Sequence, residues 1–295
     1  LKECPDSPLV LYVRGKDSPK QIFSKHQFIS IVGTRDFSPY GREWCERIVK
    51  RLSLAGQKPI IVSGLAIGVD ICAHMAALAY GLPTIAVSPV GIEDIYPRQH
   101  NVAAEKICSH DSCAIITDFP PGTPAMPYTF LRRNRIIAGM SSATIIIESK
   151  IRGGAAMTAR LASGYGRSVF ALPGRIDDIR SAACNALIAG QTAEAIVDLD
   201  SLPEILGLGP CKEEKRQDSA VLIMEKLSEL DDAGKRLALA ILGSIKNKRG
   251  ISLEELCSIH SESYNKISEM TNRLEAAGII STDLLQNCYI NVKNA

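Results

Sequence analysis

The chain has 295 residues, of which 46% are hydrophobic and 22% are charged, and its formal net charge is +2. This length suffices for one large α/β domain and one small domain. A net charge so close to zero excludes a strong whole-molecule attraction to a polyanion, so any basic surface must be local. Between residues 21 and 200, 13 of the 18 basic residues are Arg, the side chain best suited to bidentate contacts with phosphate.

The nine cysteines include no C-x-x-C pair, which indicates free thiols in a reducing, cytoplasmic compartment. Cys108, His110 and Cys113 lie close together, but no second pair with zinc-ligand spacing follows, so no metal site is predicted. No signal peptide or apolar run of membrane length is visible, and no membrane contact is expected.

Residues 1–26 are interpreted as an N-terminal extension, either the remnant of a missing domain or the approach from it. From residue 27 onward, short apolar runs alternate with helical patterns. The expected strands are 28–35, 59–66, 83–90, 113–119, 143–149 and 168–174. The expected helices are 39–55, 68–81, 98–108, 127–139, 154–165 and 181–189. This alternation predicts a Rossmann-like, doubly wound, mostly parallel α/β sheet over residues 27–206.

The composition changes after residue 206. Residues 207–230 are polar and charged and are predicted to be a linker. Residues 231–295 then show three short helices and an extended pair, which is the pattern of a C-terminal winged-helix domain. The expected helices are 235–245, 252–260 and 263–280, and the extended pair is 288–292. This segment holds eight basic and eight acidic residues, so contact with a protein is at least as well supported as reading of a DNA groove.

The predicted strands end in glycine-rich turns, where backbone N–H groups and helix N-termini can approach an anion. Arg35, Arg152 and Arg175 lie in or beside these turns. The first turn reads GTRDFSPYG rather than G-x-G-x-x-G, and G-x-x-x-x-G-K-[ST] is absent, so no nucleotide cofactor is predicted.

Residues with catalytic potential are few. Asp70 and His74 lie four residues apart and are interpreted as a helix-stabilising pair. Glu148 ends a strand and could act as a general base, but no partner carboxylate has a defined position. Ser63 lacks a G-x-S-x-G elbow, and its hydroxyl suits a phosphate oxygen better than attack on a carbonyl.

The stretch FLRRNRIIAG, residues 130–139, places three arginines among apolar side chains at the ligand edge of the sheet. Arginines there suit phosphodiesters, and Phe130 or Tyr128 could stack on a base. The alternative is that one arginine, Arg135 in particular, pairs with a buried carboxylate such as Asp118 and is structural.

Five stretches together resemble the DNA-processing protein A family, also called Smf. They are IVGTRDFSPYG, IVSGLAIGVDICAHMAAL, GIEDIYPRQHN, ITDFPPGTPAMPYTFLRRNRIIAGMS and GGAAMTARLASGYGRSVFALPG. The resemblance implies a non-enzymatic protein of natural transformation that binds and protects single-stranded DNA and loads the RecA recombinase onto it. It also implies a homodimer formed through the Rossmann domain. The residues expected to bind DNA are Gly33, Thr34, Arg35, Ser63, Gly64, Gly68, Phe130, Arg132, Arg133, Asn134, Arg135, Gly153, Gly154 and Thr158.

The sequence departs from the pattern of this family at two places, and each departure weakens one expected contact with DNA. Ile67 replaces a frequent basic residue, and GGAAMTA replaces a turn richer in hydroxyls. One alternative is a nucleotide phosphoribohydrolase-like Rossmann enzyme, but RGGAAMTAR carries no glutamate in the register of that enzyme motif. Another is a transcriptional regulator that uses the winged helix, which the neutral charge of that segment disfavours.

Overall fold

The structure is a computed structural model, and it describes all residues except 24–26, 212–230, 248–250, 284–286 and 291–295. The chain divides into two compact units, Leu1–Lys212 and Glu213–Ala295. Among the described residues, no helix combines the length and the apolar character that crossing a membrane requires.

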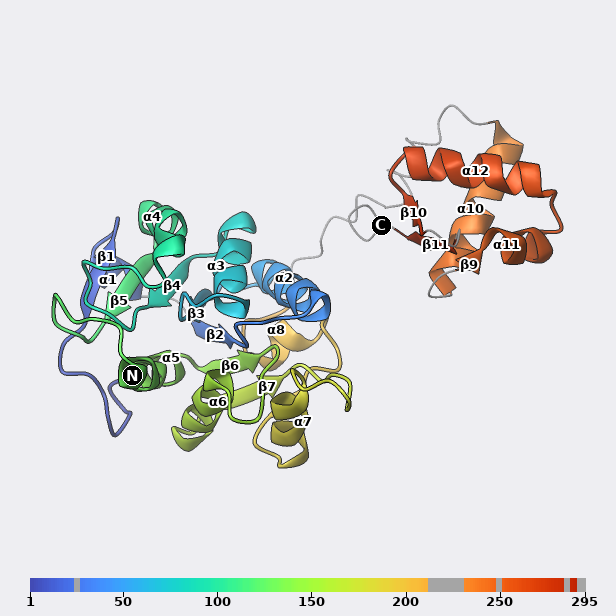
Figure 1. The fold of residues 1–295 in the computed structure, drawn as a ribbon. Helices are drawn as coiled ribbons and strands as arrows, with labels where there is room; N and C mark the ends of the chain where they lie inside the picture. Colours follow the sequence, from blue (N-terminus) through green and yellow to red (C-terminus); the bar gives the residue numbers. More distant parts are fainter. Residues whose placement is uncertain (24–26, 212–230, 248–250, 284–286, 291–295) are drawn as a thin grey trace. The chain divides into compact units, whose positions relative to one another are not determined.

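An eight-stranded sheet forms the centre of the first unit (Figure 1). Only β1 is antiparallel to its neighbour; the other neighbouring strands are parallel. Strands β3 to β6 are buried at every position, which explains their continuous apolar runs, because helices cover both faces of the sheet. In spatial order the strands are β1 (Tyr12–Gly15), β5 (Ala114–Thr117), β4 (Thr84–Val87), β3 (Ile60–Ser63), β2 (Phe28–Val32), β6 (Ala143–Ile146), β7 (Ser168–Ala171) and β8 (Glu194–Ala195).

The helices lie in two layers (Figure 1). One face carries α2 (Pro39–Ser53), α3 (Val69–Ala79) and α4 (Asn101–Ser109), and the other carries α5 (Pro127–Met140), α6 (Gly154–Gly164) and α7 (Ala182–Ala189). Shorter elements are α1 (Pro19–Phe23), the 3₁₀ helix η1 (Arg98–His100) and α8 (Leu202–Ile205).

Helix α2 shows how the sequence specifies these layers. Its buried residues Cys45, Ile48, Val49 and Leu52 repeat at helical spacing and face the sheet. Ser38 caps its start by accepting a hydrogen bond from the Gly41 N–H at 3.1 Å.

The prediction of a mostly parallel α/β sheet is confirmed, with all six expected strands and the helices between them. Residues 1–26, expected as an extension, supply β1 to the edge of this sheet, where it pairs with β5. Ile22 of the same segment is fully buried in the core. The segment is therefore part of the first unit.

The strand order changes direction between β2 and β6. Strands β3, β4 and β5 follow on one side of β2, whereas β6, β7 and β8 follow on the other. In open α/β sheets, ligands bind beyond the carboxyl ends of the strands at such a switch point. The topology therefore places the candidate site at the ends of β2 and β6.

The second unit contains three helices and a small antiparallel sheet with strand order β10-β11-β9. Its helices are α10 (Asp232–Asn247), α11 (Leu253–His260) and α12 (Tyr264–Ala276), and its strands are β9 (Ile251–Ser252), β10 (Ile280–Thr282) and β11 (Asn287–Ile290). The third helix ends at Ala276 rather than at residue 280, because Gly278 takes a φ of +69° and Ile280 joins β10. Most of the expected linker and residues 291–292 of the expected extended pair lie outside the described residues. The winged-helix assignment remains a prediction.

We expect the two units to lose stability independently. Ile145, fully buried in β6, and Ile241, fully buried in the second unit, have separate cores. Each change to alanine should lower the free energy of unfolding of its own unit by about 2–5 kcal/mol, because it removes buried apolar surface and leaves a cavity. Calorimetry should show two transitions, each moved by only one of the variants. One common transition shifted by both variants would contradict this prediction.

Candidate functional site

A cleft of about 760 Å³ opens at the carboxyl ends of β2 and β6, at the switch point of the sheet. It is lined by the turn after β2, the start of α3, the first turns of α5 and the turn between β6 and α6. The structure brings together nine of the predicted residues in this cleft: Gly33, Thr34, Arg35, Phe130, Arg133, Asn134, Gly153, Gly154 and Thr158.

Arg133 is the buried cation of the cleft, with only 4% of its surface exposed. Its Nη1 donates a hydrogen bond to the Val87 carbonyl oxygen at 3.0 Å. The side chain lies so close to Gly64 that a Cβ there would come within 1.7 Å of Nη1, so any larger residue at position 64 would displace the guanidinium. Burial lowers the pKa of Arg133 to about 10, although the Asp70 carboxylate opposes this shift.

Asp70 provides the compensating charge. This side chain is buried, and burial raises the pKa of its carboxyl group above the ordinary value, whereas Arg133 acts to lower it. Backbone N–H groups of Ala66 and Gly64 also stabilise the carboxylate. Among the described residues, Nε of Arg133 has no hydrogen-bond partner. The opposing charge of Asp70 therefore helps to hold a buried guanidinium at the wall of the cleft.

Three side chains group together at one wall of the cleft. The guanidinium carbon of exposed Arg35 lies 5.3 Å from the ring centroid of Phe130. Phe130 in turn contacts Tyr96, with ring centroids 5.2 Å apart and an interplanar angle of 71°. Cation and aromatic surface thus stand side by side, as in sites that hold a phosphate next to a base.

The start of α6 forms a further wall. Gly153, its N-cap residue, and Gly154 line the cleft, so the positive end of the helix dipole faces it, and no side chain caps that end. Asn134 Nδ2 and Thr158 Oγ1 contact the Gly154 carbonyl oxygen at 3.5 and 3.1 Å and hold this turn in place. Lys150 is exposed in the same turn. This wall favours an anion.

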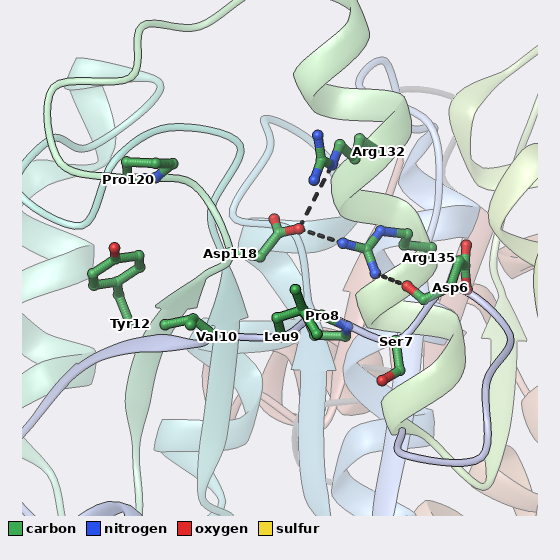
Figure 2. A pocket seen from close by; sticks show the side chains of 10 residues that line it. All are labelled: Asp6, Ser7, Pro8, Leu9, Val10, Tyr12, Asp118, Pro120, Arg132 and Arg135. Carbon is green, nitrogen blue, oxygen red and sulfur yellow. Dashed lines mark hydrogen bonds and ion pairs between the residues drawn. The ribbon is translucent and has the colours of Figure 1, made fainter.

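Arg132 and Arg135 lie on the other face of α5, because residues 130, 133 and 137 share the cleft face. They border a separate pocket of about 600 Å³ (Figure 2). Arg135 forms an ion pair with Asp118 and donates to the Asp6 carbonyl oxygen, and Arg132 Nε lies 3.7 Å from Asp118. The alternative that Arg135 pairs with Asp118 is confirmed.

Three other predicted residues do not line the cleft. Ser63 is fully buried, and its hydroxyl donates to the Ile31 carbonyl oxygen at 2.6 Å rather than pointing to a ligand. Gly64 lies under Arg133 in a small adjoining pocket. Gly68 has a φ of +90°, and a Cβ there would come within 2.3 Å of the Thr34 carbonyl oxygen. These three residues therefore support the residues that line the cleft and do not line it themselves.

Sequence reasoning missed Asp36, Tyr96 and Lys150, which also line the cleft. Tyr96 and Lys150 belong to short motifs, IYPRQHN and ESKIRGG, that only the fold brings beside Phe130 and Arg133. Glu148 is not free to act as a base, because it is buried and its carboxylate accepts hydrogen bonds from the Ser38 N–H and hydroxyl at 2.9 and 2.5 Å.

His74 contacts Thr84 rather than forming the expected pair with Asp70. Its Nδ1 lies 2.7 Å from Thr84 Oγ1. Because that hydroxyl already donates to the Ile61 carbonyl oxygen at 2.8 Å, His74 Nδ1 must carry the proton. Burial lowers the pKa of His74 to about 3, and the nearby charge of Arg133 adds to the shift. His74 is therefore a neutral core residue.

Comparison with known proteins identifies one family. The model of the family described as DNA recombination-mediator protein A matches residues 1–207. Protein Smf of Escherichia coli is 37% identical over 205 residues, which cover 69% of this chain and 52% of that protein. The chain spans about half to two thirds of the length of the curated relatives it matches.

Two solved structures share the fold of the first unit. DNA processing protein A from Streptococcus pneumoniae gives a TM-score of 0.63 at 34% identity and covers 69% of each chain. DNA processing protein A from Helicobacter pylori, described with its single-stranded DNA binding mode, gives 0.61 at 29% identity. That match covers 69% of this chain and 89% of the other.

Replacing Asp70 with asparagine should lower the free energy of unfolding by about 3–5 kcal/mol, because the buried Arg133 charge loses its partner. The double variant Asp70→Asn/Arg133→Met should recover most of this loss, since it buries no unpaired charge. Denaturant unfolding of the two single variants and the double variant gives the coupling energy. Additive effects would show that the two groups do not interact.

His74 should make the first unit sensitive to acid. Its folded pKa of about 3 lies below the unfolded value of 6.5, so only the unfolded state takes up this proton as the pH falls from 6.5 to 3. The free energy of unfolding should therefore fall by up to about 1.4 kcal/mol per pH unit through this group. A His74→Gln variant should lose that part of the slope in urea titrations across this range. An unchanged slope would contradict the assignment.

Proposed function

The chain belongs to the DNA recombination-mediator protein A family, and we propose that its cleft binds single-stranded DNA. The observation that carries the proposal is the convergence of Arg35, buried Arg133 and the uncapped start of α6 beside Phe130. Cations and a helix N-terminus hold phosphate oxygens, and an aromatic ring stacks on a base. These are the two contacts that a single strand offers.

Binding at this cleft would tolerate any sequence. Its cationic groups contact the backbone, which is the same for every base, and Phe130 offers a ring face that stacks on any base. A duplex hides its base faces in the stack, so the cleft should prefer single strands. Binding should also weaken steeply with salt, because each neutralised phosphate releases counterions.

Further roles of the whole protein belong to the same proposal. They are protection of incoming single-stranded DNA in natural transformation, loading of the RecA recombinase onto it, and assembly as a homodimer through the Rossmann-like unit. Cytoplasmic location and a C-terminal winged helix complete it. The relatives named above, two of them called DNA processing protein A, support the role in DNA processing.

A phosphoribohydrolase-like activity is not favoured. Among the described residues, two acidic side chains line the cleft. Asp36 forms an ion pair with Arg180 at 3.2 Å, and the charge of Asp70 interacts with that of buried Arg133. A hydrolase of this kind needs a carboxylate directed at its substrate. We therefore propose that the protein acts by binding.

Replacing Arg35 with alanine should weaken binding of a labelled oligothymidylate by about tenfold and reduce the slope of log affinity against log salt by about 0.7 per lost phosphate contact. Arg132→Ala is the matched control, because this exposed arginine lies on the same α5 helix as Phe130 but borders the Asp118 pocket. Fluorescence anisotropy across a salt series, with a matched duplex, measures both. Equal losses in the two variants would mean that binding is not located in the cleft.

A further inference from the structure

One side of α2 carries two neighbouring aromatic rings, inclined at 57° to each other, and a guanidinium over one of them. Tyr40, Trp44 and Arg47 recur at spacings of four and three residues, which places them in one stripe along the helix. The Tyr40 and Trp44 ring centroids lie 6.1 Å apart, and the Arg47 guanidinium carbon lies 4.3 Å from the Trp44 ring centroid. We call these three residues the α2 stripe.

The stripe is accessible. Tyr40 is 40% exposed, the Arg47 side chain is 45% exposed, and Trp44 is half-buried with part of its ring against the core. The nearby ion pair of Arg47 with Glu43, at 3.2 Å, is exposed as well and contributes little to folding. Helix α2 as a whole carries four basic and two acidic residues, so its surface favours an anion.

The stripe begins where the cleft ends along the chain. Asp36 lines the cleft, Ser38 caps α2, and Tyr40 lies in the first turn of that helix. The Tyr40 hydroxyl donates to the Pro173 carbonyl oxygen at 2.8 Å, which fixes the ring beyond the end of β7. A strand that leaves the cleft over the turn after β2 therefore meets Tyr40 first, then Trp44 and Arg47.

We propose that the α2 stripe is a second contact site for the same single strand, with bases stacked on Tyr40 and Trp44 and a phosphate held by Arg47. This inference rests on the proposed function of the cleft. Alternating aromatic rings and arginine guanidinium groups are the surface that sequence-tolerant single-strand binding uses. The stripe adds affinity only for strands long enough to reach it.

Trp44 is the single tryptophan of the chain, so its emission reports on the stripe alone. We would titrate the full chain with oligothymidylates of about six and about twenty nucleotides, since single-strand sites span roughly 4–16 nucleotides. The longer strand should quench Trp44 emission and bind about tenfold more tightly than the short one. Arg47→Ala should remove most of that gain and leave the short strand unaffected.

Three further variants complete the test. Trp44→Phe keeps a stacking ring and should retain most of the affinity for the long strand, whereas Trp44→Ala should lose it. Arg160→Ala, an exposed arginine on α6, controls for loss of charge and should change neither affinity.

The possible failures are distinguishable. Suppose that both strands bind and that Arg35→Ala weakens both. If the longer strand then does not quench Trp44 emission, and Arg47→Ala does not lower the affinity for it, the stripe inference is overturned and the proposed function of the cleft stands. If the wild-type chain binds neither strand, the proposed function itself fails.

Discussion

The site depends on one buried charge. Arg133 places a guanidinium at the point where the strand order changes direction, and only 4% of the residue is exposed. A buried cation is costly unless it is paired and hydrogen-bonded. Asp70 supplies the opposing charge, the Val87 carbonyl oxygen accepts a hydrogen bond, and Gly64 leaves the necessary space. This one side chain is therefore held by three elements: strand β4, the turn after β3 and the start of α3.

Helix α5 divides its arginines between two tasks. Its cleft face carries Arg133 and Phe130, whereas its opposite face uses Arg135 to tie Asp118 to the N-terminal segment through Asp6 (Figure 2). One face of the helix thus prepares a ligand site, and the other stabilises the edge of the sheet that β1 completes. The α2 stripe would extend the binding surface beyond the cleft, so that the length of the DNA strand rather than its base sequence determines the affinity.

The sheet was predictable because its strands are continuous apolar runs. The glycine-rich turns beside Arg35 and the arginines of residues 130–139 indicated the ligand edge. The different roles of the two faces of α5 were only partly predictable. Helical spacing shows which residues share a face, but it does not show which face meets a ligand. Ser63 illustrates the limit: its place after a strand suggested a phosphate contact, yet the hydroxyl turns inward to Ile31. Tyr96 joins the cleft through long-range packing, which no local pattern encodes. β1 was missed because its pairing with β5 spans about a hundred residues.

A crystal structure of the chain with a bound oligothymidylate tests the central claim most directly. We expect a phosphate group within hydrogen-bond reach of the Arg35 and Arg133 guanidinium groups, next to the start of α6, with the strand passing beside Phe130. A strand bound on another surface, with the cleft at the ends of β2 and β6 empty, would contradict it.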